Sequence, residues 1–336
     1  MNWKTLACTA FVALWSATAF SEAKITTVLD GLDNPSGVAI QPETGHIFVS
    51  DSGAGRVIRI VDGKAQDVIV GFKTDIYGKG PMYNIGPLGL LFLNKDTLLV
   101  GGGDLIDGEE QLRSFAVPAA GKEPIKVDQA TSSFKLPAVG ELKGEGNFYA
   151  FAATADAVFV TSNGDDTKGW VARATVKDGK LGSFERFIAT KEAVEVDAPV
   201  GATISPRGEL VIGQMGEINV PHDGLVTFYN VKDGKKLMNL PTGLYDITAL
   251  AYNPKGQQLL ALDFAWMKTD EGGLFSLVSV KNDGKQGIQA KKIIALDKPT
   301  AMAFSSDGTL YATIFGTAKE GSNKKSGSLV KIDLGN

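Results

Sequence analysis

The sequence predicts an all-β, six-bladed propeller with four-stranded antiparallel blades, and three observations support this fold class. A strand–turn–strand pattern recurs along the chain, and its first copy is GVAIQPETGHIFVSD at residues 37–51. The turn residues of successive copies are separated by 48 to 60 positions, and the residues left over at the two termini make up one further interval of similar length. Repeats that complete a ring in this way are typical of propellers, whereas an open solenoid would not need that remainder to match. The six turn residues are Gly45, Asp96, Asp156, Gly208, Gly256 and Gly308.

Each copy is followed by a second hairpin. Residues 55–70, GRVIRIVDGKAQDVIV, contain two strand-like runs around Asp62-Gly63, a dipeptide typical of tight β-turns. The pentapeptide VKDGK occurs at 176–180 and again at 231–235. Apolar runs rich in β-branched residues, without a helical stripe, favour strands over helices. Four short strands per repeat make one blade; seven shorter blades would also fit the length, but the counted motifs indicate six.

The two ends of the chain are expected to meet in one blade. The last repeat, SGSLVKIDLGN, ends after its third strand, and residues 24–29, KITTVL, can supply the missing outer strand. Because an unpaired sheet edge is a liability, we expect this N-terminal strand to close the ring. Small residues at the start of the first strands, such as Gly37 and Gly89, suit a crowded central channel.

Residues 1–23 are expected to be a secretory signal peptide, and residues 24–336 a single propeller domain. Lys4 precedes an apolar run over residues 6–20, and the small residues Ala19 and Ala23 fit a cleavage site. The alternative is a membrane anchor, which needs roughly 20 apolar residues rather than about 15. The expected location is secreted or periplasmic, with no membrane span after cleavage. The single cysteine, Cys8, lies in the removed segment, so the mature chain has no thiol.

The charge balance and the motifs exclude several classes of function. The chain has 34 Lys plus Arg against 38 Asp plus Glu, a net charge of −4, so it lacks the basic excess that nucleic-acid binding requires. It has no G-x-S-x-G motif and no Walker or dinucleotide glycine pattern, so the sequence contains no motif for serine-hydrolase or nucleotide chemistry. The expected partner is a small molecule, a carbohydrate or a protein, bound by a monomer.

The loops that enter the first strands and those that follow the second strands emerge on one face of a propeller, around the channel mouth. These loops carry acidic, amide and aromatic side chains that can cradle a sugar or a cationic group. The alternative is that each acidic residue is a solvated loop position. His222 is the one histidine of these loops and the candidate general base. The predicted ligand-binding residues are Tyr77, Tyr83, Asp104, Asp165, Glu217, Asp263 and Trp266.

Aligning the copies on their turns places carboxylates in one column before the first strands, and this alignment pairs Gly146 with Ala198. A ring of carboxylates can hold Ca²⁺ or another divalent cation, with amide oxygens as further ligands. The alternative is that Asp and Asn are common at such turns because they bond the local backbone. A slip of one residue in the alignment would scatter the column. The predicted metal ligands are Asp33, Glu145, Asn147, Asp197 and Asp246.

Residues 31–60, GLDNPSGVAIQPETGHIFVSDSGAGRVIRI, resemble an NHL-type repeat, and the six-fold set is similar to the propellers of the gluconolactonase (SMP-30) and strictosidine-synthase-like group. The resemblance covers nearly the whole mature chain, but its motifs are structural. It implies a metal held by a Glu near the start of the first blade and by Asn and Asp from later blades. Asp33-Asn34-Pro35 stands at the first of these positions, whereas Asn147, Asp197 and Asp246 match the later ones.

Two functions remain open on the sequence. The first is an exported propeller that binds a small ligand, a carbohydrate or a partner protein at the channel mouth. The alternative is a lactonase-like hydrolase that depends on calcium or another divalent metal, in which the cation polarises a carbonyl or activates water. The sequence favours binding, because Asp33-Asn34-Pro35 departs from the Glu that the resemblance implies at the first-blade position.

Overall fold

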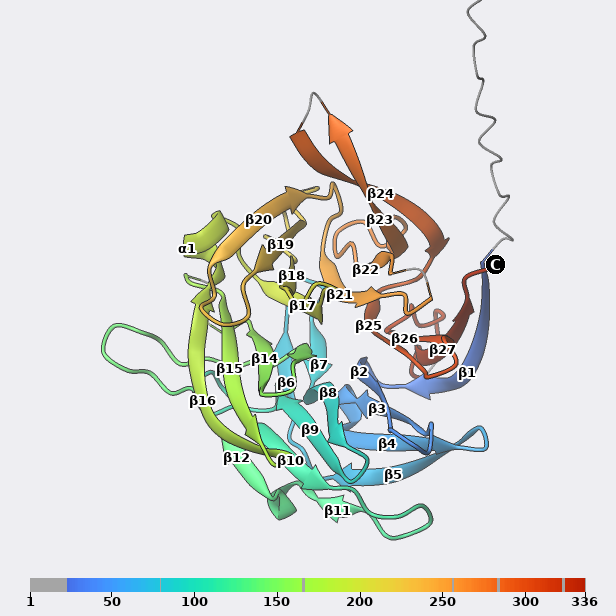
Figure 1. Cartoon of the computed structure of the whole chain (residues 1–336). Coiled ribbons are helices and arrows are strands. Elements are labelled where there is room, and N and C mark those ends of the chain that lie inside the picture. The colour runs from blue at the N-terminus through green and yellow to red at the C-terminus, as the bar shows by residue number, and fades with distance from the viewer. Residues whose placement is uncertain are drawn as a thin grey trace, which may run out of the picture.

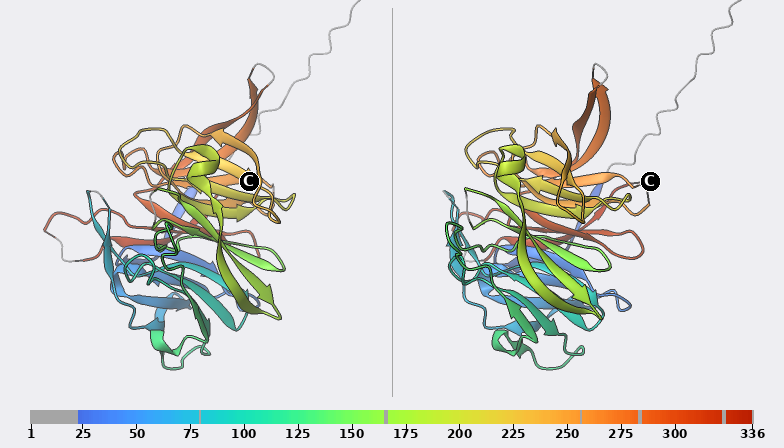
Figure 2. Two further views of the ribbon diagram at one scale, coloured as in Figure 1. Left: turned by 90° about the vertical axis from the view of Figure 1, so that its left-hand side faces the viewer. Right: turned by 60° about the vertical axis from the view of Figure 1, so that its left-hand side comes forward.

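The computed structural model describes residues 23–78, 80–164, 167–255, 257–282, 285–321 and 324–335. Within them, six antiparallel sheets are arranged around a central axis, which confirms the predicted six-bladed propeller (Figure 1). Side views show the blades as a disc with loops on both faces (Figure 2). The described part of the chain contains no helix long and apolar enough to cross a membrane.

In the first three blades the strands run from the axis outward in chain order. Blade one gains a parallel strand, β11 (Ile125–Lys126), on its outer edge. The blade strands are β2 (Pro35–Ile40), β3 (Ile47–Asp51), β4 (Arg56–Val61) and β5 (Lys64–Val70); β8 (Pro87–Asn94), β9 (Thr97–Gly102), β10 (Leu112–Ala116) and β12 (Ser132–Phe134); β13 (Phe151–Ala153), β14 (Ala157–Ser162), β15 (Trp170–Lys177) and β16 (Lys180–Ala189).

The last three blades follow the same order, except that the final outer strand comes from the N-terminus. The strands of blades four, five and six are β17 (Pro199–Ile204), β18 (Leu210–Gln214), β19 (Leu225–Tyr229) and β20 (Lys236–Pro241); β21 (Ile247–Tyr252), β22 (Leu259–Asp263), β23 (Gly273–Asn282) and β24 (Lys285–Ala295); β25 (Pro299–Phe304), β26 (Leu310–Ile314), β27 (Gly327–Asp333) and β1 (Lys24–Leu32).

Elements outside the blades are few. A separate two-stranded hairpin, β6 (Asp75–Tyr77) with β7 (Tyr83–Ile85), connects blade one to blade two. This hairpin and β11 were not expected from the repeats. The helices of the described ranges are short: η1 (Ser52–Ala54), η2 (Val127–Gln129) and α1 (Thr190–Val194).

The ring is closed as predicted. β1 pairs antiparallel with β27, from Lys24 opposite Asp333 to Leu32 opposite Gly327, and the two strands lie side by side in Figure 1. Blade six also reaches blade one near the axis, where the Thr300 hydroxyl donates to the Pro35 carbonyl at 2.6 Å. Blade six therefore closes the ring in two places: its outer edge pairs with the N-terminal strand, and its inner strand bonds to blade one.

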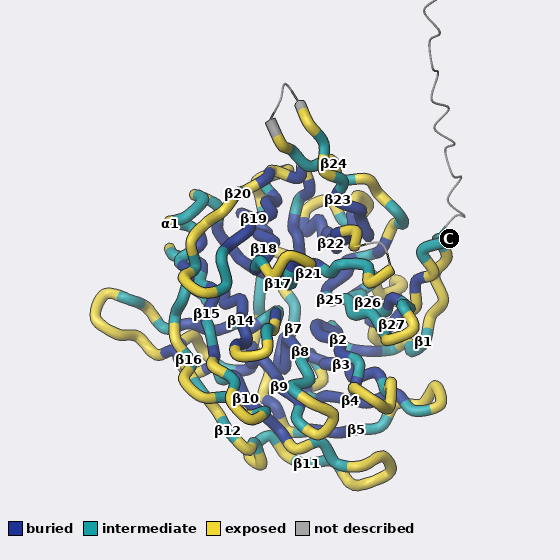
Figure 3. Tube along the Cα trace, in the orientation of Figure 1, coloured by how far each residue is buried: buried dark blue, intermediate teal, exposed yellow. Residues whose placement is uncertain are grey.

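Six apolar clusters of the core lie at the interfaces between neighbouring blades, one at each interface, and two smaller clusters lie at the channel mouth. Between blades one and two, for example, Phe48 and Val57 pack against Leu98 and Phe115, all fully buried. Figure 3 shows the same pattern, with the buried residues on the inner strands and the exposed ones in the loops. Each buried aliphatic or aromatic side chain contributes about 1.5–3 kcal/mol of burial free energy, so face-to-face packing of the blades stabilises the ring.

Small residues are required where the inner strands converge, as predicted. A Cβ added to Gly37 would lie 2.1 Å from the Leu88 carbonyl oxygen of the next blade, and one added to Gly89 would lie 2.3 Å from the Tyr149 oxygen. Both contacts are with backbone atoms, which cannot rotate away. The close approach of the first strands therefore determines the width of the channel.

Candidate functional site

The inner strands end at a cavity at the channel mouth. Each blade contributes to its wall the residue at the same place in its first strand or just before it. These side chains are Ser36, Leu88, Tyr149, Val200, Thr248 and Thr300.

The polar atoms of this wall are bonded within the protein. The Thr248 hydroxyl donates to the Pro299 carbonyl at 2.9 Å, and the Tyr149 hydroxyl donates to the Thr300 carbonyl at 3.1 Å. The Ser36 hydroxyl likewise donates to a backbone carbonyl, at 3.0 Å. Burial raises the pKa of Tyr149, so its phenol stays protonated and remains a donor. Because the donors are already used, this wall offers the cavity mainly apolar surface.

An aromatic cluster covers the outer end of the cavity. We define it as Tyr77, Tyr83, Phe264, Trp266 and Phe315. Phe264 and Trp266 stack with their ring centroids 4.8 Å apart, and the edge of Tyr83 meets Trp266 at 5.2 Å and Phe315 at 5.0 Å. The two tyrosines come from the β6–β7 hairpin, whereas the other three rings follow the second strands of blades five and six. Segments far apart in the sequence thus form one aromatic surface.

Two buried carboxylates hold the Trp266 loop in place. Asp263 accepts hydrogen bonds from the backbone of Asp246 at 2.7 Å and of Ala265 at 3.1 Å, and Asp246 accepts one from the Trp266 backbone N–H at 2.5 Å. Burial raises the pKa of Asp246 to about 7, and the Asp263 and Asp223 charges act in the same direction. Asp263, predicted to bind a ligand, is 1% exposed and serves here to bond the loop backbone.

Hydrogen-bonding groups are available at the polar edge of the cavity. The side chains of Asn147 and Asn163 line it, and the Asn163 amide nitrogen donates to the Tyr77 hydroxyl at 2.8 Å. The Asn163 Oδ1 and Trp266 Nε1 atoms are buried without a hydrogen-bond partner among the described residues. Buried polar atoms are usually paired, so these two atoms are candidates to bind a ligand.

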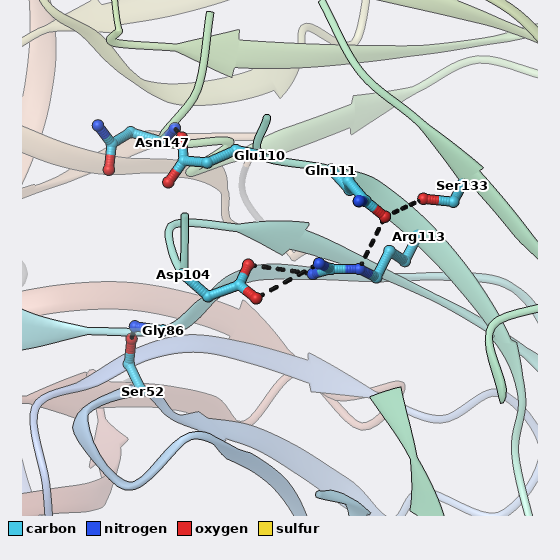
Figure 4. Close-up of polar contacts among 8 residues, drawn as sticks. All are labelled: Ser52, Gly86, Asp104, Glu110, Gln111, Arg113, Ser133 and Asn147. Carbon is cyan, nitrogen blue, oxygen red and sulfur yellow. Dashed lines mark hydrogen bonds and ion pairs between the residues drawn. The ribbon is translucent and has the colours of Figure 1, made fainter. Parts of the chain in front are cut away.

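Glu110 lies beneath Asn147 and supports its backbone (Figure 4). Its side chain is 1% exposed, and its Oε2 accepts the Asn147 N–H. Burial raises the pKa of Glu110 to about 9, and the charges of Asp107 and Asp104 act in the same direction. Asp104, another predicted binding residue, points instead to Arg113, with two contacts of 3.1 and 3.3 Å. Glu110 and Asp104 are thus used to support the structure.

A second, more polar cavity adjoins the first and shares Tyr77, Asn163 and Met215 with it. Its lining includes the carboxylates of Asp197 and Glu217. The Lys191 ammonium lies 3.0 Å from Asp197 and 3.9 Å from Glu217. The predicted residue Glu217 is therefore at the channel mouth, beside the aromatic cluster.

The structure does not assemble the predicted metal ligands. Asp33 pairs with Lys325 at 2.8 Å and Asp197 with Lys191, while Asp246 bonds the Trp266 backbone. The fully buried Glu145 accepts the Ser162 hydroxyl at 2.8 Å. Over the described ranges, no three His, Cys, Asp or Glu side chains form a group that could hold a metal ion. Each of these four carboxylates has a protein donor on at least one oxygen, and the metal-ligand assignment stays a prediction.

The alignment of the repeats that gave the predicted column of carboxylates is wrong by one residue in blade three. The equivalent left-handed position before the first strand is Asn34, Ala198 and Lys298, with φ of 48°, 52° and 59°, and in blade three it is Asn147, with φ 49°. The alignment of the repeats places Gly146 there instead. The long connection between β12 and β13 shifts the numbering, and Asn147 rather than Glu145 or Gly146 faces the cavity.

The remaining predicted residues lie apart from the cavity or outside the described residues. His222 is exposed, its Nδ1 lies 2.8 Å from the Gly243 oxygen, and its ring packs on Tyr245 at 4.2 Å. It lines neither cavity. Asp165 lies outside the described residues.

Sequence reasoning missed the side chains that directly follow the second strands. Met215, Phe264 and Phe315 occupy this same place in blades four, five and six, and Asn163 occupies it in blade three. All four line the cavity. The sequence could have indicated these residues. The alignment of repeats that gave the carboxylate column also places the residues directly after the second strands in one column. The hairpin tyrosines have no equivalent in the other repeats.

No protein-family profile matches the chain, and no curated protein matches it. Solved structures with the same fold do. A putative oxidoreductase (glucose dehydrogenase) from Thermus thermophilus aligns at a TM-score of 0.60 and 16% identity, over 93% of this chain and 100% of that one. A gluconolactonase from Xanthomonas campestris aligns at 0.57 and 13%, over 93% and 90%. The PQQ-bound aldose sugar dehydrogenase from Streptomyces coelicolor aligns at 0.58 and 14%, over 93% and 99%.

These similarities show the fold. The expected likeness to gluconolactonase-like propellers is confirmed at that level, and sugar dehydrogenases share the architecture equally. At 13–16% identity the chemistry of the neighbours does not transfer. The function has to be argued from the cavity itself.

Proposed function

We propose that this chain is an exported binding protein that takes a small, planar, mainly apolar molecule into the cavity at its channel mouth. The observation that carries the proposal is the aromatic cluster over a wall whose hydroxyls are already bonded within the protein. A planar ligand would bury its faces against Trp266 and Tyr83 and gain both area burial and ring contacts.

The polar edge supports a ligand with one donor and one acceptor group. The Trp266 indole N–H can donate to an acceptor, and the Asn163 oxygen can accept from a donor. A free sugar is a poorer fit, because its many hydroxyls would meet few available partners in the wall. A metal-dependent hydrolase gains no support from the residues present, since the predicted carboxylates are held by lysines, a hydroxyl or backbone N–H groups.

The binding proposal can be tested with the fluorescence of Trp266. The chain has four tryptophans, and replacing Trp3, Trp15 and Trp170 by Phe leaves Trp266 as the only one. We call this the single-tryptophan variant. Titration with 2-naphthol or indole should change its emission with saturation, and glucose should not. Saturation by glucose alone would overturn the proposed ligand class, and no response to any probe at millimolar concentration would overturn binding.

A matched pair of substitutions locates the site. Tyr83→Ala removes a ring of the aromatic cluster and should weaken 2-naphthol binding about ten-fold, the equivalent of about 1.4 kcal/mol. Met82→Ala changes the neighbouring residue on the same hairpin, which is 61% exposed and lines neither cavity. It should leave binding unchanged. Equal effects of both substitutions would place the probe elsewhere.

The export part of the proposal has its own test. It rests on the charged and apolar pattern of residues 1–23. Expression of the full chain in a bacterium should give a protein in the culture medium or periplasm whose N-terminus, by mass spectrometry, follows Ala19 or Ala23. An intact N-terminus in the cytoplasm would contradict export without affecting the cavity.

A further inference from the structure

The central channel holds a further cavity, which we call the inner cavity. Its wall is formed by the residues that follow the mouth residues along the inner strands, as Gly37 follows Ser36. Tyr149, Thr248 and Thr300 line both the inner cavity and the cavity at the channel mouth. The two cavities are therefore consecutive along the channel, and they meet at the level of these three side chains.

The Tyr149 side chain crosses the channel at this level. The residue lies just before β13 of blade three, and its hydroxyl donates to the Thr300 carbonyl of blade six at 3.1 Å. Blades three and six are opposite each other in a ring of six. The ring of Tyr149 packs on the way against a cluster in blade four, formed by Ala198, Val200 and Met215. Tyr149 is the one aromatic residue among the six equivalent side chains of the mouth wall.

The width of the channel around Tyr149 is fixed by hydrogen bonds between neighbouring blades. The Ser50 hydroxyl of blade one donates to the Leu88 carbonyl of blade two at 2.6 Å. The Thr161 hydroxyl of blade three donates to the Val200 carbonyl of blade four at 3.0 Å, and the Thr300 bond described above joins blade six to blade one. Because the inner strands are tied together, passage between the two cavities depends on the Tyr149 side chain.

We propose that the Tyr149 ring is the floor of the ligand cavity and determines how long a ligand the protein accepts. This inference rests on the proposed binding function, to which it adds a specificity-determining residue. Without the ring, the mouth cavity and the inner cavity would form one continuous channel. The wall of the inner cavity includes Gly37, Gly89 and Ala249 together with larger apolar residues, so a narrow alkyl chain is the group that would enter it.

The test compares 2-naphthol with 6-butyl-2-naphthol, which has the same rings and hydroxyl and an added alkyl tail. Both are titrated against the single-tryptophan variant, with the emission of Trp266 as the signal. After Tyr149→Ala, the tailed probe should bind about ten-fold more tightly than 2-naphthol, because the tail is buried in the inner cavity. With Tyr149 in place, the tail should give no such gain.

The matched control is Tyr149→Phe, which removes the hydroxyl that bonds Thr300 and keeps the ring. It should behave like the natural residue. A tail that gives no gain after Tyr149→Ala, or an equal gain after Tyr149→Phe, would overturn the proposal. Circular dichroism melting reports whether each variant folds. Should Tyr149→Ala fail to fold, Tyr149→Leu replaces it, because leucine keeps apolar packing against blade four and is too short to reach Thr300.

A measurement without ligand separates this inference from the proposed function. An apolar space of this kind takes up xenon. Crystals of the Tyr149→Ala variant under xenon pressure should show a xenon atom between the mouth and inner cavities, and crystals of the Tyr149→Phe variant should show none there. Absence of xenon in Tyr149→Ala would mean that neighbouring side chains close the gap, which would overturn the floor. If no naphthol binds to any variant while xenon occupies the opened channel, the proposed function fails and the floor stands.

Discussion

Glu110 makes the stability of this propeller depend on pH, in a direction opposite to that of a salt-bridged carboxylate. Its pKa is raised to about 9 by burial, whereas in the unfolded chain it returns to its ordinary value near 4.5. Below pH 4.5 both states are protonated and the group has no effect. Between pH 4.5 and 9 the unfolded state has released a proton that the folded state retains, so stability falls as the pH rises.

The expected magnitude follows from one proton. The slope is about 1.4 kcal/mol per pH unit, so the free energy of unfolding should fall by about 3 kcal/mol between pH 6 and pH 8 through Glu110 alone. Glu110→Gln keeps the acceptor for the Asn147 N–H and removes the titration. The free energy of unfolding of this variant should therefore fall less steeply with pH, by about 1.4 kcal/mol per pH unit. At pH 8 the variant should be more stable than the natural chain.

Urea unfolding at pH 6, 7 and 8 measures this slope. The neighbouring acid provides the matched control: Glu109 is 57% exposed and pairs with Lys135 at 2.6 Å. Glu109→Gln should leave the slope unchanged. If Glu110→Gln kept the natural slope, or if Glu109→Gln removed as much of it, the claim that burial controls the titration of Glu110 would be refuted.

Three further predictions concern the fold and the metal question. Deletion of residues 24–29 should lower the melting temperature by about 10 °C or more, because it exposes the edge of β27; an unchanged melting curve would contradict ring closure. Gly37→Ala should cost about 1–3 kcal/mol in urea unfolding, because its Cβ would meet the Leu88 oxygen, and a neutral result would show that the strands can separate. Melting temperatures in Ca²⁺ and in chelator should agree within about 1 °C, and a Ca²⁺-induced rise that Asp197→Ala abolishes would restore the metal site.

The blades and their closure could be predicted because the information is local and repeated. Asp62-Gly63 marks a tight turn, and the structure places it between β4 and β5, with φ of 50° and 74°. The incomplete last repeat and the strand at residues 24–29 indicated the same closure that β1 and β27 make. Because the pattern occurs six times, a strand or turn that is ambiguous in one copy can be assigned by comparison with the other copies.

The site was only partly accessible by the same reasoning. Tyr77, Tyr83 and Trp266 were selected by residue type and meet at one cavity. Glu145 was placed in the carboxylate column by an alignment that slipped by one residue. Asp104 and Asp263 were selected as exposed loop acids, yet they are buried against Arg113 and backbone N–H groups. The residues next to an acidic side chain in the sequence do not predict whether that side chain faces solvent or the protein interior.

The sequence by itself determined the number of blades, the hairpins within them and the strand that joins the ends, because turn propensity, strand alternation and repeat spacing depend on residues close together in the chain. Only the tertiary structure decided which side chains meet at the channel mouth. Trp266 and Tyr83 are 183 positions apart, and their contact depends on a hairpin that has no counterpart in the other repeats. The charge partners of the buried acids likewise depend on packing between segments, which fixes both their pKa values and their roles.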